Sequence, residues 1–113
     1  MSDCIFCRIA GHDLPADVIF EDEDIVAFRD SNPQAPVHVL FIPRRHISGI
    51  GEMESEDQLL MGKLLYTATR QAKALGLGEG YRVVINNGRK GGQHVFHIHL
   101  HLLGGRNMGW PPG

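Results

Sequence analysis

The chain has 113 residues, of which 42% are hydrophobic and 21% are charged, and its formal net charge is −2 at pH 7. This size and composition predict a single globular domain over residues 1–113 with a buried core. The sequence contains no basic block and no apolar run near the roughly 20 residues of a bilayer span, which argues against nucleic-acid and membrane partners. No segment at the N-terminus resembles a signal peptide, so we expect a cytoplasmic protein.

The first part of the chain is predicted to be mostly β-structure after a short helical turn. Asp17–Glu21 and Ile25–Asp30 flank the acidic turn Asp22-Glu23-Asp24, which is typical of a hairpin. Val37–Pro43 is a mostly apolar run between prolines, and this predicts a buried strand.

The clearest helix follows. Ser55 can cap its start, and Gln58 three residues later completes a capping box. Apolar side chains then recur at helical spacing until Gly76, a natural C-terminal stop. These side chains are Met61, Leu64, Leu65, Ala68, Ala72 and Leu75.

The last third of the chain is predicted to hold two more strands. These are Tyr81–Asn86 and Val95–Leu103, with a glycine-rich loop over 87–92 between them. A predominantly β chain with one long and one short helix is an α+β protein, in which we expect the long helix to cover one sheet face.

Three histidines alternate along the last predicted strand. His97, His99 and His101 stand at every second position, so they share one face, while the apolar residues between them point toward the core. Neighbours on one face are about 6–7 Å apart, so the three imidazoles lie within reach of one small ligand.

The spacing of these histidines leaves two kinds of chemistry open. Three imidazoles can hold a catalytic zinc ion, or one neutral imidazole can attack a phosphorus atom while its neighbours bind the phosphate. The segment just before the strand offers N–H donors from Asn86, Gly91, Gly92 and Gln93, as a phosphate cradle requires.

The pattern His-φ-His-φ-His-φ-φ, where φ is apolar, resembles the signature of the histidine triad (HIT) family. Further motifs along nearly the whole chain resemble the Hint branch of that family. In chain order they are Ile5-Phe6, Leu14-Pro15, Phe20-Glu21-Asp22, Pro33-Gln34-Ala35-Pro36-x-His38, Ile42-Pro43, His46-Ile47-Ser48, Gly80-Tyr81-Arg82, Gly91-Gly92-Gln93, Gly104-Gly105-Arg106 and Trp110-Pro111-Pro112-Gly113. The resemblance implies a five-stranded antiparallel sheet with one long and one short helix, and a homodimer whose sheets join into ten strands.

The resemblance also implies an activity. Hint proteins hydrolyse purine nucleoside phosphoramidates and aminoacyl adenylates, releasing AMP or GMP without a catalytic cofactor. The middle histidine, His99, would form a covalent nucleotidyl-histidine. His101 would contact the phosphate and manage the leaving group, and His38 would support the triad. The alternatives are a nucleotide-binding regulatory protein with incidental hydrolysis, a dinucleoside polyphosphate hydrolase and a zinc-dependent hydrolase.

Nucleotide-binding positions follow from the same resemblance. The purine slot would be lined by Ile5, Phe6, Ile9, Leu14 and Phe28. Asp30 would bind the ribose hydroxyls, and Asn86, Gly92 and Gln93 the phosphate. His94 stands where Hint proteins often carry a small hydroxyl residue. Trp110, in a tail over 104–113, would reach the active site of the partner subunit.

The pair Cys4-x-x-Cys7 supplies two candidate metal ligands. Some bacterial histidine triad proteins complete a structural zinc site with two histidines, which correspond here to His46 and His97. The alternative is two reduced thiols near a surface histidine.

Overall fold

The computed structural model describes residues 3–113, which form a five-stranded antiparallel sheet in the order β1-β2-β3-β5-β4. The strands are β1 (Val18–Glu21), β2 (Ile25–Arg29), β3 (Val37–Pro43), β4 (Arg82–Val84) and β5 (Leu100–Gly104), and the helices are α1 (Ile5–Ala10) and α2 (Gln58–Ala74). Three short 3₁₀ turns are η1 (Ile50–Glu52), η2 (Ser55–Asp57) and η3 (Arg89–Gly91). The predicted α+β fold is confirmed. Within residues 3–113, no helix is both long and apolar enough to cross a membrane.

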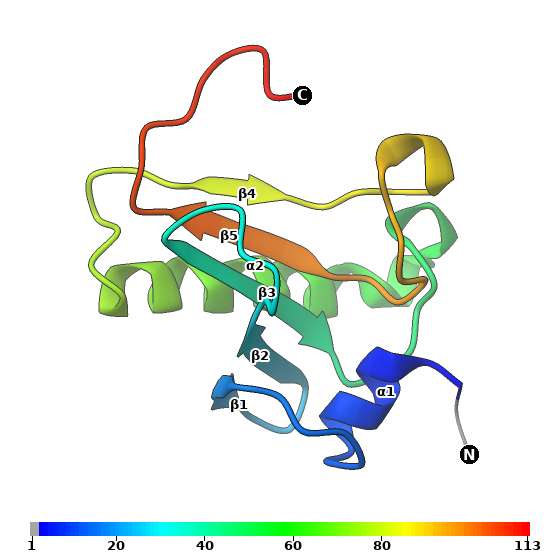
Figure 1. Ribbon diagram of the computed structural model, residues 1–113. Helices are drawn as coiled ribbons and strands as arrows, with labels where there is room; N and C mark the ends of the chain where they lie inside the picture. The colour runs from blue at the N-terminus through cyan, green and yellow to red at the C-terminus, as the bar shows by residue number, and fades with distance from the viewer. Residues whose placement is uncertain (1–2) are drawn as a thin grey trace.

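The sheet buries a separate apolar cluster on each face, because side chains alternate along every strand. Helix α2 lies along one face of the sheet (Figure 1). Its Leu64, Ala68 and Ala72 pack there against apolar side chains of β2, β3 and β5. On the other face α1 packs through Phe6 and Ala10 against β2 and β3. The central strands are therefore covered on both sides, and the α1 side carries the candidate site.

Strands β4 and β5 are both shorter than predicted. β5 pairs with β3 and β4, whereas residues 95–99 run beside the loop after β3, where the Ile98 N–H donates to the Ile47 carbonyl at 2.7 Å. The side-chain alternation nevertheless continues into this segment. Ile98 lies in the cluster under α2, and His97 and His99 contact α1 on the other side.

The capping box observed before α2 belongs to the turn η2 and starts one residue earlier than predicted, whereas the N-cap residue of α2 itself, Asp57, makes no side-chain capping hydrogen bond. The Glu54 carboxyl accepts from the backbone of Asp57, and the Asp57 carboxyl accepts from the Glu54 N–H at 2.8 Å. The predicted box from Ser55 to Gln58 is therefore wrong, because Ser55 lies inside η2 and the reciprocal bond is made by the Asp57 carboxylate, which is buried and also pairs with Arg45. Leu65, predicted to face the core, is 48% exposed on the outer side of the helix.

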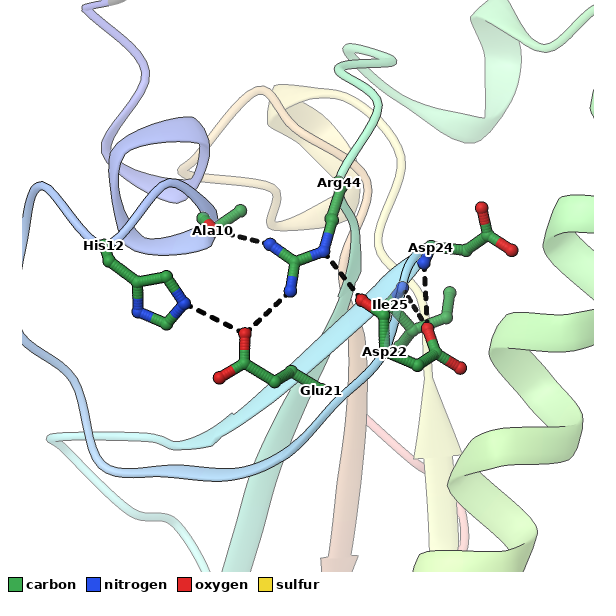
Figure 2. Close-up of polar contacts among 7 residues, drawn as sticks. All are labelled: Ala10, His12, Glu21, Asp22, Asp24, Ile25 and Arg44. Atoms are coloured by element: carbon green, nitrogen blue, oxygen red, sulfur yellow. Dashed lines mark hydrogen bonds and ion pairs between the residues drawn. The ribbon is translucent and has the colours of Figure 1, made fainter.

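Arg44, just after β3, holds the end of α1. Its guanidinium donates to the Ala10 carbonyl at 2.6 Å and the Asp22 carbonyl at 2.8 Å (Figure 2). It also donates to the Glu21 carboxylate at 2.7 Å, and the hydrogen bonds from Arg44 and His12 lower the pKa of that carboxyl. Arg44 therefore connects α1, the β1–β2 turn and β3.

Candidate active site and metal-binding cluster

A cleft of about 860 Å³ opens on the α1 side of the sheet. Its wall combines apolar side chains of α1, β2 and β3 with polar groups of the loop after β2, the loop before β5 and β5 itself. The lining residues are Ile5, Phe6, Ile9, Pro15, Ala16, Asp17, Phe28, Arg29, Asp30, Ser31, Gln34, Leu40, Asn86, Gly92, His94, Val95, His99 and His101. An apolar wall with a few convergent polar groups is the usual character of a small-molecule site.

Most of the residues predicted to bind a nucleotide line this cleft. Those present are Ile5, Phe6, Ile9, Phe28, Asp30, Asn86, Gly92 and His94. Leu14, Gln93 and Trp110 are not among the lining residues, and Pro15 and Ala16 line the wall next to Leu14. Sequence reasoning also missed Leu40 and Val95. The alternation of β3 could have identified Leu40, since its side chain points to the same face as that of His38.

His99 has one nitrogen committed to the backbone. Its Nδ1 lies 2.8 Å from the carbonyl oxygen of His97, and a carbonyl can only accept, so Nδ1 carries the proton and Nε2 carries the lone pair. The Phe6 ring meets the imidazole edge to face, with centroids 5.1 Å apart. Burial lowers the pKa of His99, which keeps the ring neutral at pH 7. The Nε2 atom of His99 is therefore suited to act as a nucleophile.

The proton positions of His38 and His101 follow from a chain of hydrogen bonds. The Gln34 N–H donates to His38 Nδ1 at 3.0 Å, so the proton of His38 lies on Nε2. His38 Nε2 is 2.9 Å from His101 Nδ1, which must then accept. The proton of His101 consequently lies on its own Nε2, ready to donate to a ligand in the cleft.

The surroundings keep both of these histidines neutral. Burial lowers the pKa of His38, and burial with the neighbouring His99 and His38 lowers the pKa of His101 to about 4. Asp30 lies at the same wall, with one carboxylate oxygen 3.4 Å from His38 Nε2 and the other accepting the Asn32 N–H at 2.9 Å. The carboxylate is thus held in a fixed position beside the histidines.

Gln93 supports the loop before β5 from inside. Its side chain accepts from the Gly88 N–H at 2.8 Å and donates to the carbonyls of Ser48 and Val95 at 2.7 and 3.0 Å. Its own N–H donates to the Gly88 carbonyl at 3.0 Å. The buried amide therefore fixes the segment that brings Gly92 to the cleft.

A second polar cluster joins the start of α1 to the segment before β5. His46 Nδ1 and His97 Nδ1 are 3.2 Å apart, and the sulfur–nitrogen distances are 3.4 Å from Cys4 to His97, 3.4 Å from Cys7 to His46 and 3.5 Å from Cys7 to His97. Ligand atoms around a tetrahedral zinc ion stand about 3.3 Å apart for two nitrogens and about 3.6 Å for nitrogen and sulfur. The four residues therefore fit a metal ion of this kind.

The tautomer of His97 is also the one that a metal ligand requires. Its Nε2 lies 2.7 Å from the Pro43 carbonyl, so Nε2 donates and Nδ1 directs its lone pair at the cluster. Burial lowers the pKa of His97 to about 4, which keeps that lone pair available.

The triad imidazoles do not converge on one ion. Within residues 3–113, the two groups able to hold a metal are the Cys4 cluster, which includes His97, and Asp30 with His38 and His101. No triad histidine shares a group with another. Zinc chelation by the triad, which the spacing alone left open, is therefore not favoured by the geometry.

Comparison with known proteins gives consistent matches. A family model described as the HIT domain matches residues 12–108. The chain is 50% identical over 114 residues to adenylylsulfatase HINT1 of Arabidopsis thaliana, covering 99% of this chain and 78% of that protein. A HIT family hydrolase from Legionella pneumophila has a TM-score of 0.97 at 54% identity, covering 98% of this chain and all of that one. A zinc-bound histidine triad family protein from Mycobacterium smegmatis has a TM-score of 0.79 at 34% identity, covering 93% and 76% of the two chains.

The family match includes β1 to β5, and it contains His38, His99 and His101 together with Asp30. The solved structures share the arrangement of sheet and helices over nearly the whole chain. On this combined evidence of sequence, fold and site, the chain belongs to the HIT domain family, the histidine triad proteins.

Proposed function

We propose that this protein hydrolyses purine nucleoside 5′-phosphoramidates, and aminoacyl adenylates as a second substrate class, through a covalent nucleotidyl intermediate on His99. The observation that carries the proposal is the state of that imidazole. It is neutral, its Nδ1–H is fixed on a backbone carbonyl, and its Nε2 lone pair is available in the cleft.

The reaction proceeds in two displacements at phosphorus. The Nε2 lone pair of His99 forms the N–P bond, while the bond from phosphorus to the leaving nitrogen breaks and its electron pair takes up a proton from solvent, so that the nitrogen leaves as the amine. Water then attacks the phosphorus and releases one proton to solvent, and the electron pair of the N–P bond returns to Nε2. One water is consumed overall, because the proton taken up in the first displacement is returned in the second and the hydroxyl remains on the phosphate. His101 donates its Nε2–H to the phosphoryl group, where negative charge increases in the transition state.

The cleft would hold each part of a nucleotide at a different wall. The purine would pack on Ile5, Phe6, Ile9 and Phe28, with Leu14 next to the lining residue Pro15, and Asp30 would accept from the ribose hydroxyls. Asn86, Gly92 and His94 would contact the phosphate, with Gln93 holding their loop. The bound ligand would then be AMP or GMP and their phosphoramidates.

Adenylyl sulfate is a second candidate substrate, because the Arabidopsis relative at 50% identity is an adenylylsulfatase. The same attack by His99 would break the bond from phosphorus to the sulfate oxygen. Sulfate leaves as a stable anion and needs no proton, so this reaction depends less on proton supply than amine release does.

Cys4, Cys7, His46 and His97 would hold a structural zinc ion, as their distances and the tautomer of His97 support. The ion would fix the start of α1 to the segment before β5 and take no part in the chemistry, since a closed site has no open position for substrate. Reduced thiols of this kind are typical of the cytoplasm, where we expect the protein to act.

We also propose that the 1–113 domain works as a homodimer. β4 is the last strand of the sheet, and its outer edge offers unpaired backbone groups to a second sheet (Figure 1). The tail over 104–113 leaves the body of the domain beside β4, and its Trp110 is 84% exposed, as a side chain that contacts a partner's cleft would be in one chain alone.

Release of AMP from adenosine phosphoramidate tests the activity, with adenylyl sulfate and diadenosine tetraphosphate assayed in parallel. We expect efficient release from the phosphoramidate and a loss of at least about 10³-fold in His99→Ala, as for other covalent nucleophiles. Equal rates in the two proteins would refute the role of His99. Nucleotide binding without turnover would point to a regulatory protein. Faster hydrolysis of diadenosine tetraphosphate than of the phosphoramidate would instead indicate a dinucleoside polyphosphate hydrolase.

A further inference from the structure

The motif Gly104-Gly105-Arg106 has no part in the reaction described above. It ends β5 and packs closely on two other segments. A Cβ atom at Gly104 would lie 2.6 Å from a methyl carbon of Leu77, and one at Gly105 would lie 2.9 Å from Pro36. Gly105 also has a φ of +90°, which disfavours other residues. Gly104 therefore lets β5 end directly against Leu77, which follows α2, and Gly105 lets the chain turn against Pro36 in the loop before β3.

That turn brings Arg106 to the loop that carries Gln34. The Nε and Nη2 atoms of Arg106 donate to the Gln34 carbonyl at 3.2 and 3.1 Å, and Nη1 donates to the Asn107 carbonyl at 3.1 Å. Hydrogen bonds from Asn32 N–H to Asp30 and from the Gln34 amide to Asn32 stay inside the loop. Arg106 thus connects an exposed loop to the end of the central sheet.

Gln34 also determines which ring nitrogen of His38 carries the proton. Its carbonyl is held by Arg106, and its N–H donates to His38 Nδ1. A pair of hydrogen-bonded histidines has two possible arrangements. Either His38 donates to His101, or His101 donates through its own Nδ1 and keeps only a lone pair on Nε2.

Only the first arrangement fits the surroundings. In the second, His38 Nδ1 would carry a hydrogen facing the Gln34 N–H, so that two donors would meet. The Asp30 carboxylate, 3.4 Å from His38 Nε2, also favours a hydrogen on that nitrogen. The second arrangement would present a lone pair of His101 to an anionic phosphate, which it would repel.

We propose that Gly104-Gly105-Arg106 is a clamp that selects the donor tautomer of His101, with Arg106 acting as a positioning residue through Gln34 and His38. The catalytic consequence of the clamp rests on the proposed phosphoramidate hydrolysis, whereas the tautomer itself does not. Loss of Arg106 frees the Gln34 carbonyl, so the backbone on both sides of Gln34 can shift and its N–H can move away from His38 Nδ1. The two histidines then exchange between the two arrangements.

The test combines imidazole ¹⁵N NMR of the full-length protein with steady-state hydrolysis of adenosine phosphoramidate. The variants are Arg106→Met, which removes all donors, and Arg106→Lys, which keeps the charge and one donor group. Arg70→Met is the matched control, since the guanidinium of Arg70 lies on the outer side of α2, 6.0 Å from the ring centre of Tyr66. Thermal unfolding of each variant is recorded, and Arg106→Lys serves for both readouts if Arg106→Met does not fold.

In the wild-type protein and in Arg70→Met, we expect the ¹⁵N shifts of His101 to show a single tautomer with hydrogen on Nε2. In Arg106→Met they should move toward a mixture, and kcat should fall about tenfold, with KM changing less, which corresponds to about 1.4 kcal/mol. The His101 shifts and the kcat of Arg106→Lys should lie between those of the wild-type protein and those of Arg106→Met.

An unchanged His101 spectrum in Arg106→Met would overturn the clamp, and so would a wild-type kcat in that variant. A fall of kcat of the same size in Arg70→Met would also overturn the clamp. If wild-type protein releases no AMP, the proposed function fails, and the NMR comparison still decides whether the clamp exists.

Discussion

At the scale of single residues, the three triad histidines differ in which ring nitrogen carries the proton and in what that nitrogen or its neighbour contacts. His97 and His99 donate to backbone carbonyls, so their lone pairs face a metal cluster and the cleft, respectively. His101 accepts from another histidine and is left with a hydrogen to donate. One repeated residue type therefore directs a lone pair at the Cys4 cluster, a lone pair into the cleft and an N–H into the cleft, which suits the three different roles proposed for them.

Because these histidines are neutral in the folded protein, we expect the free energy of unfolding to decrease as the pH is lowered. The folded pKa of His101 is about 4, while an unfolded histidine titrates near 6.5. The unfolded chain thus binds more protons between these values, so the contribution is complete above pH 6.5 and is lost as the pH falls toward 4. We expect His101 to account for a fall of about 1–2 kcal/mol in the free energy of unfolding between pH 7.5 and 5.

Urea unfolding at the two pH values measures this effect. His101→Asn cannot titrate there, so its unfolding free energy should change less than that of the wild type over the same range. An equal change in the two proteins would show that His101 does not carry the pH dependence.

At the scale of secondary-structure elements, α1 is short but carries parts of both sites. Phe6 and Ile9 line the cleft, and Cys4 and Cys7 belong to the metal cluster. A six-residue helix is not stable on its own, so its position depends on tertiary contacts. Arg44 supplies such a contact at the C-terminal end, where a cation also interacts favourably with the helix dipole.

Replacement of Arg44 by methionine should therefore loosen α1. We expect the free energy of unfolding to fall by about 1–2 kcal/mol, because charged hydrogen bonds to two carbonyls are lost. KM for the nucleotide should rise more than kcat falls, because Phe6 belongs to the proposed purine slot and does not react with the substrate. Arg70→Met is again the control, and a wild-type Tm with an unchanged KM in Arg44→Met would exclude this role.

Local patterns in the sequence predicted the main elements well. The hairpin around Asp22, the buried strand Val37–Pro43 and α2 all form where alternation or helical spacing indicated. The capping box of η2 and the shortened β5 were missed for a common reason. Both involve distant partners that local periodicity does not reveal, since Arg45 pairs with the Asp57 carboxylate of the box and the Ile47 carbonyl accepts from the segment before β5.

At the scale of the whole molecule, the sequence predicted which residues meet more reliably than how each one acts. The resemblance to histidine triad proteins placed His38, Asp30 and the α1 residues together, and the cleft and its surroundings contain them. The tautomers could not be predicted, because they depend on carbonyls and N–H groups such as those of Pro43 and Gln34. Trp110 is exposed, and its surroundings would be complete only in the proposed dimer.

Cys4, Cys7, His46 and His97 join the start of α1 to the segment before β5, so removal of the proposed zinc ion should lower stability. We expect purified protein to bind one zinc ion per chain, and chelation or Cys7→Ser to lower Tm by several degrees or more, because the binding free energy of structural zinc contributes to folding. His99→Ala should keep its zinc. Loss of zinc in His99→Ala, or an unchanged Tm after chelation, would contradict a structural site at Cys4, Cys7, His46 and His97.

The most direct test of the central claim is to capture the nucleotidyl-histidine itself. Adenosine phosphoramidate is mixed with wild-type protein and with His99→Ala, the reactions are quenched in alkali within milliseconds to seconds, and the peptides are identified by mass spectrometry. The account predicts an adenylyl group on the peptide that contains His99, formed and lost at rates that match AMP release, and none in His99→Ala. Rapid AMP release with no adenylylated peptide, or with the label on another residue, would contradict it.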